Sequence, residues 1–476
     1  MTQMHENDEH KPSEEKELSN QPPFWTRRRV IQAGLVTGLA VSPLLTNGLA
    51  LAAPAAGPLP WAAANTILSE TLVPTFPSRT FSLTSYGGKG DGKTDNTVAF
   101  QKAIAACNTA GGGQVEVTAG TYVTGAIHLL SNVNLHLNSG VTLMFSSDAS
   151  KYPLVLTRYE GVECMNHSPM IYAYGQTNIA LTGSGILDAS KTSSWNQGSD
   201  RAGVLDPLVA EGVPPDKRDV AGKLRSTFVE PYNCNTVLIQ GVTLRNSRFW
   251  QLHPTLCKNV TVDGVTTNVS SANTDGCDPE CCDHVVIKNS TIKAGDDNIA
   301  IKSGRDADGR RINVPCQNIV IWNNVFEGPW GAITLGSELT GGIQNVYAFS
   351  NSTTSKGTRF VHYVKSNTLR GGFAKNINID TFHGSNLNTA VMFITMTYNS
   401  QTGSFPPNFS GPFTLNKVVI DTAPIVLDLV GLSSDKIGPV ALSNSTFTTI
   451  KHATSTIANT KSVTYTNVTI NGKSVG

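Results

Sequence analysis

Short alternating apolar runs recur along this chain from about Ile179, and each run is bounded by Asn or Gly. Val237, Val260 and Val285 hold equivalent places in three successive runs, 23 and 25 residues apart. The later intervals, which lead to Val418, are 34, 27, 31 and 41 residues, as expected where loops are inserted. A strand-based period in the twenties is typical of a solenoid of stacked coils, in which each coil buries its inner side chains against the next. The sequence therefore predicts an all-β fold, a single-stranded parallel β-helix.

Two other all-β architectures fit the repeat less well. A β-sandwich would show strands about every 8–12 residues without a long-range period, and a propeller needs about four strands in every forty residues. Asn at the ends of the runs suits coil corners, because its amide forms ladders and its backbone tolerates left-handed turns.

One segment departs from the strand pattern. Val98, Phe100 and Ile104 follow one another at helical spacing, Asp95 precedes them as the expected N-cap, and three glycines from Gly111 end the run. We expect a short N-terminal helix that caps the open end of the solenoid core.

The charge balance narrows the class of partner. The chain carries 36 Lys and Arg against 35 Asp and Glu, a net charge of +1, whereas nucleic-acid-binding proteins normally carry a basic excess. Charged residues make up only 15% of its 476 residues, below the roughly 25% of ordinary globular domains. We therefore expect no nucleic-acid partner, and many short strands joined by turns rather than an intracellular helical enzyme.

The N-terminal region has the order of an export peptide. Three consecutive arginines precede an uncharged stretch at 33–53 that ends in small residues, which resembles a twin-arginine signal. The alternative is a membrane anchor, but Pro and polar residues interrupt the stretch, and no other segment is apolar enough to span a bilayer. We expect a periplasmic or extracellular protein without stable membrane insertion. Its expected parts are an export signal at 1–53, a linker at 54–79 and a β-helix catalytic domain at 80–476.

Several of the eight cysteines lie close together. Cys277, Cys281, Cys282 and His284 invite a metal site, but they lack the paired C-x-x-C spacing of zinc sites. A twin-arginine signal would export a chain that has already folded in a reducing compartment, so the thiols need not be paired. We interpret them as small buried side chains of a stacked core and expect no metal ligand among them.

The densest polar constellation is a set of three carboxylates. The interval from Asp275 to Asp296 is close to one coil, and Asp297 follows directly, so stacked coils would bring the three to one face. Clustered like charges raise the pKa of at least one carboxyl group, and glycoside hydrolysis needs a protonated acid and a carboxylate that activates water. Two alternatives remain, aspartates that only cap turns and a calcium site. His253 precedes Asp275 by a similar interval and is expected one coil below it, as a corner histidine or as a substrate ligand.

With these residues the chain resembles glycoside hydrolase family 28, the polygalacturonase-like family of right-handed parallel β-helices in the pectate-lyase-like superfamily. The resemblance runs from about Thr80 to at least Phe382. Asn273-Thr274-Asp275 and Gly295-Asp296-Asp297 are similar to the two carboxylate motifs of the family, which are the specific signal. The segment 86–95 is similar to the start of pectate-lyase-like β-helices in general and supports the fold more than the activity.

The resemblance implies a secreted hydrolase of pectin-like or other uronate-containing polysaccharides and oligosaccharides. It implies cleavage with inversion and without a cofactor, Asp296 acting as the general acid while Asp275 and Asp297 hold the attacking water. We expect the protein to act as a monomer.

Two positions depart from the family pattern. Trp330 stands where the family usually has His, and Tyr363 stands where it has Arg, although Lys365 is kept. Arg370 and the two glycines after it match the exo-acting bacterial branch. The expected substrate-binding residues are Asn273, His253, Trp330, Lys365 and Arg370.

These departures leave the substrate open. A neutral or deoxy sugar at the cleavage point is an alternative to galacturonate, and a polysaccharide lyase or a non-catalytic glycan-binding β-helix are alternatives to the hydrolase. A polar insert at 191–225 is expected beside the cleft, where such loops decide between terminal and internal cleavage.

Overall fold

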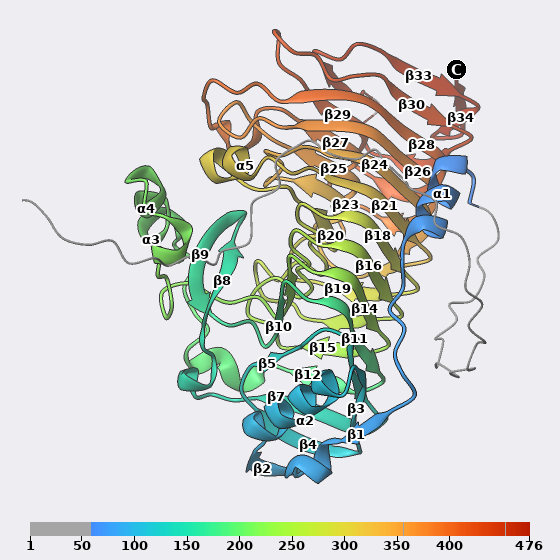
Figure 1. The fold of residues 1–476 in the computed structure, drawn as a ribbon. Helices are drawn as coiled ribbons and strands as arrows, with labels where there is room; N and C mark the ends of the chain where they lie inside the picture. The colour runs from blue at the N-terminus through green and yellow to red at the C-terminus, as the bar shows by residue number, and fades with distance from the viewer. Residues whose placement is uncertain (1–58, 356, 453) are drawn as a thin grey trace, which may run out of the picture. The chain divides into compact units, whose positions relative to one another are not determined.

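The chain folds into a right-handed parallel β-helix with a small N-terminal helix, as the repeat and the resemblance predicted (Figure 1). The computed structural model describes residues 59–355, 357–452 and 454–476. The expected export signal at 1–53 lies outside the described residues and stays a prediction. In the described part of the chain no helix is long and apolar enough to cross a membrane.

Two parallel ladders of strands form the main sheet and merge in the three long strands β24, β26 and β28. The first ladder runs through β1 (Thr80–Ser82), β3 (Gly113–Val117), β6 (Val133–Leu137), β11 (Thr177–Gly183), β14 (Asn235–Gln240), β16 (Lys258–Asp263), β18 (Asp283–Lys288), β21 (Cys316–Trp322), β24 (Ile343–Thr353), β26 (Phe373–Asn386), β28 (Asn408–Ala423), β30 (Val440–Ser443) and β33 (Val463–Thr466). The second adds β2 (Asp91–Asp95), β4 (Gly120–Thr124), β7 (Val141–Phe145), β12 (Ile186–Asp188), β15 (Thr243–Arg245), β17 (Thr266–Asn268), β19 (Thr291–Lys293), β22 (Val325–Phe326), β31 (Thr446–Ile450), β34 (Val468–Ile470) and the antiparallel β35 (Lys473–Val475).

The second sheet is interrupted in the middle of the solenoid. Its strands are β5 (Ile127–His128), β10 (Ile171–Tyr174), β13 (Val229–Tyr232), β20 (Ile299–Ile301), β23 (Gly331–Gly336), β25 (Phe360–Lys365), β27 (Ala390–Thr395), β29 (Ile425–Val430) and β32 (Thr456–Ala458). Between β13 and β20 only isolated parallel bridges continue it, one column being Leu252, Cys277 and Ile299, the other Thr255, Glu280 and Lys302. The chain is therefore least regular where the carboxylate motifs lie.

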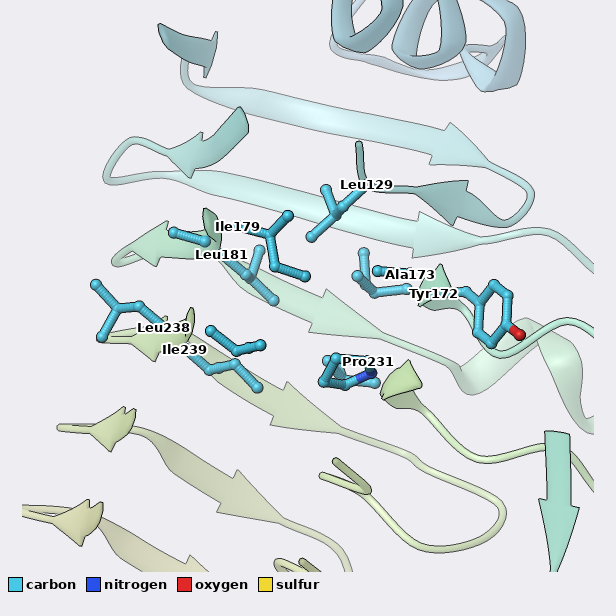
Figure 2. Close-up of a pocket in the computed structure, with 12 residues that line it drawn as sticks. Leu129, Tyr172, Ala173, Ile179, Leu181, Pro231, Leu238 and Ile239 are labelled. Carbon is cyan, nitrogen blue, oxygen red and sulfur yellow. The ribbon is translucent and has the colours of Figure 1, made fainter. Parts of the chain in front are cut away.

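Apolar side chains from the inner faces of the sheets fill the solenoid. Figure 2 shows a small gap in this core, whose lining includes Leu129, Ile179, Leu181 and Ile239 from neighbouring coils. Its volume is about 10 Å³ and its lining is apolar, so it has barely room for one water and nothing to bind it. We interpret this gap as an imperfection of packing.

The coil corners carry the expected Asn ladder. Asn318, Asn345 and Asn376 all adopt a left-handed φ of 58°. The side-chain amide of Asn345 donates to Oδ1 of Asn318 at 3.0 Å, and that of Asn376 donates to Oδ1 of Asn345 at 2.9 Å. The prediction of left-handed corners joined by amide ladders is confirmed.

A second ladder, of cysteines, runs inside the coils. The backbone N–H of Cys234 donates to Sγ of Cys257 at 3.4 Å, that of Cys257 to Sγ of Cys282 at 3.4 Å, and that of Cys282 to Sγ of Cys316 at 3.3 Å. All eight cysteines are buried and unpaired. The interpretation as small buried thiols is confirmed.

One interval of the predicted repeat is wrong. Ile377 pairs with Phe413, whereas the repeat of apolar runs placed Val418 at the equivalent position. Val418 pairs instead with Phe382, in the second half of the same two long strands. Because β26 and β28 span both ladders, each contains two apolar runs of similar pattern, and the sequence does not say which of them is equivalent.

The capping helix α2 (Thr97–Thr109) forms where it was expected. Oδ1 of Asp95 accepts the N–H of Thr97 at 2.9 Å, so Asp95 caps the helix from one residue before the structural N-cap, Asn96. Phe100 and Ile104 face the first coils and are buried there. The helix thus closes the N-terminal end of the core.

The segment expected to be a linker is structured from residue 59 onward. Helix α1 (Ala62–Glu70) buries Ile67 in an apolar cluster with Val320 and Tyr347, on the outer face of β21 and β24. The chain then runs along the main sheet to β1 (Figure 1). On the way, Phe76 packs with Leu238 in a small apolar cluster. We call residues 59–79 the N-terminal strap.

An insertion between β7 and β13 leaves the solenoid beside the irregular coils. Its first part, between β7 and β10, is the antiparallel hairpin β8 (Leu154–Tyr159) and β9 (Val162–His167), and its second part, between β12 and β13, holds the short helices α3 (Arg201–Val204) and α4 (Asp206–Ala210). The three solenoid strands β10, β11 and β12 lie between the two parts. Leu205 and Leu224 pack with Phe249 and Trp250 in one apolar cluster. The remaining helix, α5 (Asp306–Ile312), lies between β20 and β21.

Candidate active site

The two carboxylate motifs lie side by side on neighbouring coils. The backbone N–H of Gly276 donates to the carbonyl oxygen of Asp297 at 3.0 Å, and Cys277 pairs with Ile299. Asp275 and Asp297 each come two residues before these paired positions, at the entrance to the second sheet. The interval between the motifs in the sequence was therefore a sound guide to their proximity.

The motifs open onto a polar cavity of about 240 Å³. Its walls come from the carboxylate turns, the tip of the β8–β9 hairpin, the turn after β23 and the segment after β27. The lining residues are Glu160, Trp250, Asn273, Asp275, Asp296, Lys302, Arg305, Ser337, Glu338, Lys365, Arg370, Tyr398, Asn399 and Gln401. Charged groups dominate this lining, as suits a charged or strongly polar ligand.

The three aspartates form one cluster. One carboxylate oxygen each of Asp275, Asp296 and Asp297 lies within 4.8 Å of the other two. Burial and then the neighbouring charge of Asp297 raise the pKa of Asp296. Burial also raises the pKa of Asp275, to about 7, although the Lys302 ammonium opposes the shift. The cluster therefore retains a proton at a pH where an ordinary aspartate is ionised.

The surroundings of Asp296 and Asp297 differ. Asp297 is fully buried, and its Oδ1 accepts the N–H of Gly331 and the hydroxyl of Thr334, both at 2.8 Å. Its Oδ2 accepts from Nζ of Lys365 at 2.9 Å. Asp296 is only partly buried and lines the cavity. Asp297 is thus held in place by its partners, and Asp296 is the most exposed member of the cluster.

Lys302 connects the cluster to the rest of the cavity. Its Nζ lies 3.4 Å from Oδ2 of Asp275, 3.2 Å from Oε2 of Glu338 and 4.1 Å from the centre of the Trp250 ring. Glu338 also contacts Arg305 at 3.1 Å and Arg370 at 3.6 Å. These cations keep the pKa of Glu338 well below its usual range despite complete burial.

Asp278 is a further acidic group behind this cluster. It is fully buried 3.6 Å from Nζ of Lys302, and neither carboxylate oxygen has a hydrogen-bond partner among the described residues. Burial, and then the charge of Asp275, raise its pKa well above the usual range. Asp278 therefore holds its proton to a higher pH than an ordinary aspartate does.

A metal ion is one possible occupant of three adjacent carboxylates. Two ammonium groups already balance the negative charge of the cluster, because Lys302 contacts Asp275 and Lys365 contacts Asp297. A divalent cation would have to displace them or lie beside them, which like-charge repulsion disfavours.

The structure brings four of the predicted substrate-binding positions close to the motifs, but not all into the cavity. Asn273, Lys365 and Arg370 line it. Arg370 is held by Asp306, which accepts from its Nε at 2.8 Å, and by the carbonyl oxygen of Ser337. Trp330 precedes Gly331, which binds Asp297, but it is not among the lining residues. The guanidinium of Arg359 covers its ring at 3.8 Å from the centroid.

His253 lies apart from the cavity. It is fully buried, and its Nε2 is 2.9 Å from Oε2 of Glu280. Glu280 in turn binds the guanidinium of Arg158, from the β8–β9 hairpin, at 2.9 Å. His253 thus belongs to a buried polar cluster that fixes the hairpin to the solenoid. Stacking one coil below Asp275 did not imply access to the same ligand.

The cysteines near the motifs do not converge with His284. Cys281 accepts from the Arg158 guanidinium at 3.3 Å, while His284 lies at the corner beside Asp283 and Glu70. Tyr363, at the position where the family has Arg, is buried, and its ring stacks on that of Phe393 with 5.2 Å between the ring centres. Nζ of Lys365 lies 4.7 Å from the centre of the Tyr363 ring.

Sequence reasoning missed several lining residues. Lys302 had a usable signal, since it follows Asp297 at the end of an alternating strand in which Ile299 and Ile301 point inward. Glu160, Tyr398 and Gln401 had none, because they come from irregular loops far away in the chain.

A cluster of partly protonated carboxylates on the outer face of a parallel β-helix is suited to acid–base cleavage of glycosidic bonds. The model of the family described as Glycosyl hydrolases family 28 matches residues 214–422, and that of Rhamnogalacturonase A/epimerase, pectate lyase-like, matches residues 80–156. A probable polygalacturonase of Vitis vinifera is 30% identical over 390 residues, which is 77% of this chain and 73% of that protein. An exo-poly-alpha-D-galacturonosidase of Dickeya chrysanthemi is 29% identical over 71% of this chain and 60% of its own length.

Solved structures agree with these relatives. A hyperthermoactive exopolygalacturonase from Thermotoga maritima has a TM-score of 0.79 and 32% sequence identity over 86% of this chain and 96% of its own. A family 28 exopolygalacturonase from Yersinia enterocolitica has a TM-score of 0.65 and 25% identity over 83% of this chain and 77% of its own. The fold and these likenesses define a glycosyl hydrolase. The chain belongs to the glycosyl hydrolases family 28.

Proposed function

We propose that this protein hydrolyses galacturonan in pectic polysaccharides and releases sugar from chain ends. The observation that carries the proposal is the cluster of Asp275, Asp296 and Asp297, within 4.8 Å of one another beside a cavity that holds four cationic side chains. The relatives described as galacturonan hydrolases, three of them exo-acting by name, support this choice of substrate and mode.

Asp296 is the proposed general acid. It is the most exposed member of the cluster, and its raised pKa keeps a proton available for the leaving oxygen of the glycosidic bond. Burial and the charge of Asp297 supply that shift.

Asp275 and Asp297 are proposed to hold the attacking water. Asp275 faces the cavity and takes the proton of the water, while Asp297, fixed by Gly331, Thr334 and Lys365, orients it. In the transition state the bond from water to the anomeric carbon forms as the bond to the leaving oxygen breaks.

Recognition of uronate is assigned to the cations of the cavity. Lys365 and Arg370 line it beside the acids, and a guanidinium binds a carboxylate in bidentate fashion. Half-buried Trp330 and exposed Arg359 form a pair next to the Asp297 turn and are proposed to contact the neighbouring sugar. We further propose that the protein acts as a monomer.

Chain-end cleavage is supported by the walls of the cavity. The hairpin tip at Glu160 is tied to Arg305, at 3.2 Å, and the 398–401 segment closes another side. Loops that enclose a cavity limit access to the ends of a polymer. We further propose export to the periplasm or outside the cell, where such polymers are found.

The test is a screen of the purified protein on polygalacturonate and rhamnogalacturonan, with reducing ends and ultraviolet absorbance followed together. We expect reducing ends without absorbance on polygalacturonate, and a loss of about 10²–10⁴-fold in rate for Asp296→Asn. The matched control is Asp421→Asn, an exposed aspartate on β28. An absorbing, unsaturated product would identify a lyase, and glycan binding without cleavage would identify a binding protein.

Stereochemistry is a second readout. We propose inversion, which the carboxylate motifs imply, although separations of about 6.5–9.5 Å are usual for inverting pairs and about 5–5.5 Å for retaining ones. The oxygen separations of up to 4.8 Å here are nearer the second range. Proton NMR of the first-formed product distinguishes the two, and a retained anomer would overturn inversion.

A further inference from the structure

A second polar groove lies beside the cavity. It has a volume of about 510 Å³, within the range of about 300–1,000 Å³ that is usual for ligand sites. It is lined at three levels of the solenoid by the ends of β15 and β17 and by a 3₁₀ turn at 190–194. Its lining residues are Ser190, Ser193, Arg245, Asn246, Ser247, Arg248, Asn268, Val269, Ser270 and Ser271. Hydroxyls, amides and guanidinium groups make up nearly all of this lining.

The groove and the cavity are neighbours, because Ser271 lines the groove and Asn273, two residues later, lines the cavity, and Arg225 bridges the two linings. One guanidinium nitrogen of Arg225 donates to the carbonyl oxygen of Arg248, in the groove, at 3.0 Å. The other donates to Oδ1 of Asn273, in the cavity, at 3.3 Å. The groove is therefore close enough to the carboxylate cluster to hold another sugar of the same polymer.

The two arginines of the groove differ in their partners. Nε of Arg245 lies 2.9 Å from Oδ2 of Asp188, so its charge is already matched. Nε of Arg248 is buried without a hydrogen-bond partner in the described part of the chain. That nitrogen is itself covered, but the Arg248 side chain as a whole is half-buried, lines the groove and pairs with no carboxylate of the described residues, so its guanidinium is free to bind an anion that enters the groove.

We propose that the groove is an accessory subsite for a uronate residue of the polysaccharide, in which Arg248 binds the carboxylate. Serine hydroxyls and the amide of Asn268 offer both donors and acceptors for the sugar hydroxyls. This subsite rests on the proposed function, because a galacturonan carries one carboxylate on every sugar. A galacturonan that occupies both the cavity and the groove is expected to bind more tightly than a fragment that fills the cavity alone.

The test compares galacturonate oligomers of two to six units as substrates. The measured quantity is the ratio of kcat/KM for the hexamer to that for the dimer. We expect Arg248→Gln to lower this ratio about tenfold, which is the size of one charge-assisted hydrogen bond, and mainly through KM. Ser193→Leu, which narrows the groove from its exposed rim and keeps both arginines, is expected to lower the ratio as well.

Lys258→Gln is the control, because Lys258 is an exposed cation on β16 outside the groove. A ratio in Arg248→Gln equal to that of the control would overturn the subsite. Raising the salt concentration is expected to lower the ratio of the parent protein more than that of Arg248→Gln.

The design separates this subsite from the proposed function. If the parent protein cleaves none of the oligomers, the proposed function fails. The groove is then tested by calorimetry with hexagalacturonate, in which weaker binding by Arg248→Gln supports the subsite and equal binding overturns it.

Discussion

Nζ of Lys302 lies 3.4 Å from Oδ2 of Asp275, although the two residues are 27 positions apart in the chain. The ammonium group lowers the pKa of a carboxyl group that burial raises to about 7. Asp275 and Asp296 also interact, so their protons belong to the pair rather than to either residue. Lys302 therefore controls the pH range in which the proposed base is ionised and the proposed acid is protonated.

Replacing Lys302 with Gln should move the acidic limb of the pH profile of kcat/KM upward by about one unit or more, because the ionised form of Asp275 loses its nearest cation. The profile is measured on a galacturonate oligomer between pH 3 and 9. Lys288→Gln is the matched control, since Lys288 is also buried and paired with an aspartate, on β18. If the acidic limbs of the Lys302 variant and the parent coincide, Lys302 does not set the pKa of Asp275.

Glu338→Gln should destabilise the protein at pH 7 by about 3–5 kcal/mol, because it leaves Lys302, Arg305 and Arg370 buried without their shared anion. The folded-state pKa of Glu338 is lowered, so its stabilisation is present above about pH 4.3, its unfolded value, and is lost as the pH falls further. The melting temperatures of variant and parent should therefore converge in acid. The control is Glu211→Gln, because Glu211 is exposed. A difference in melting temperature between Glu338→Gln and the parent that does not become smaller in acid would contradict this account.

Trp330→Ala should raise KM about three- to tenfold with little change in kcat, because a stacking platform contributes about 0.5–1.5 kcal/mol to binding. Arg359→Ala, which uncovers the Trp330 ring, isolates the contribution of the guanidinium. Steady-state kinetics on the trimer of galacturonate give both constants. A fall in kcat alone would show instead that Trp330 positions the neighbouring Asp297 turn.

The native protein should contain eight free thiols that react only after unfolding, since all eight cysteines are buried and unpaired. Titration with a thiol reagent in denaturant, without reductant, measures the count, and the native protein serves as the comparison. A reducing agent should leave the melting temperature unchanged. Fewer than eight thiols in the denatured protein would reveal a disulfide and contradict the cysteine ladder.

Much of the fold could be predicted because a solenoid repeats its physical constraints at each coil. Val237, Val260 and Val285 do pair in register, and the Asn corners follow from the left-handed backbone that each turn needs. The prediction failed at Val418, where long strands carry two similar apolar runs. Periodicity indicates that coils stack, but it does not show which residues of such long strands are equivalent.

The candidate site was predictable only where it followed the same repeat. Asp275, Asp296 and Asp297 come together because their spacing is close to one coil. His253 obeys the same spacing, yet its side chain enters a buried cluster beneath the hairpin, because an insertion covers that part of the sheet. Spacing gives position along the solenoid, whereas inserted loops decide which positions stay open.

The N-terminal strap has a consequence for the order of events during synthesis. Its helix α1 rests on Val320 and Tyr347, which leave the ribosome long after Ile67. This helix must therefore wait for most of the coils before it can dock. Domains generally fold as they are synthesised, from the N-terminal side. Here residues 59–70 can dock only after β21 and β24 have formed, so until then the strap remains without the surface that covers its apolar side chains.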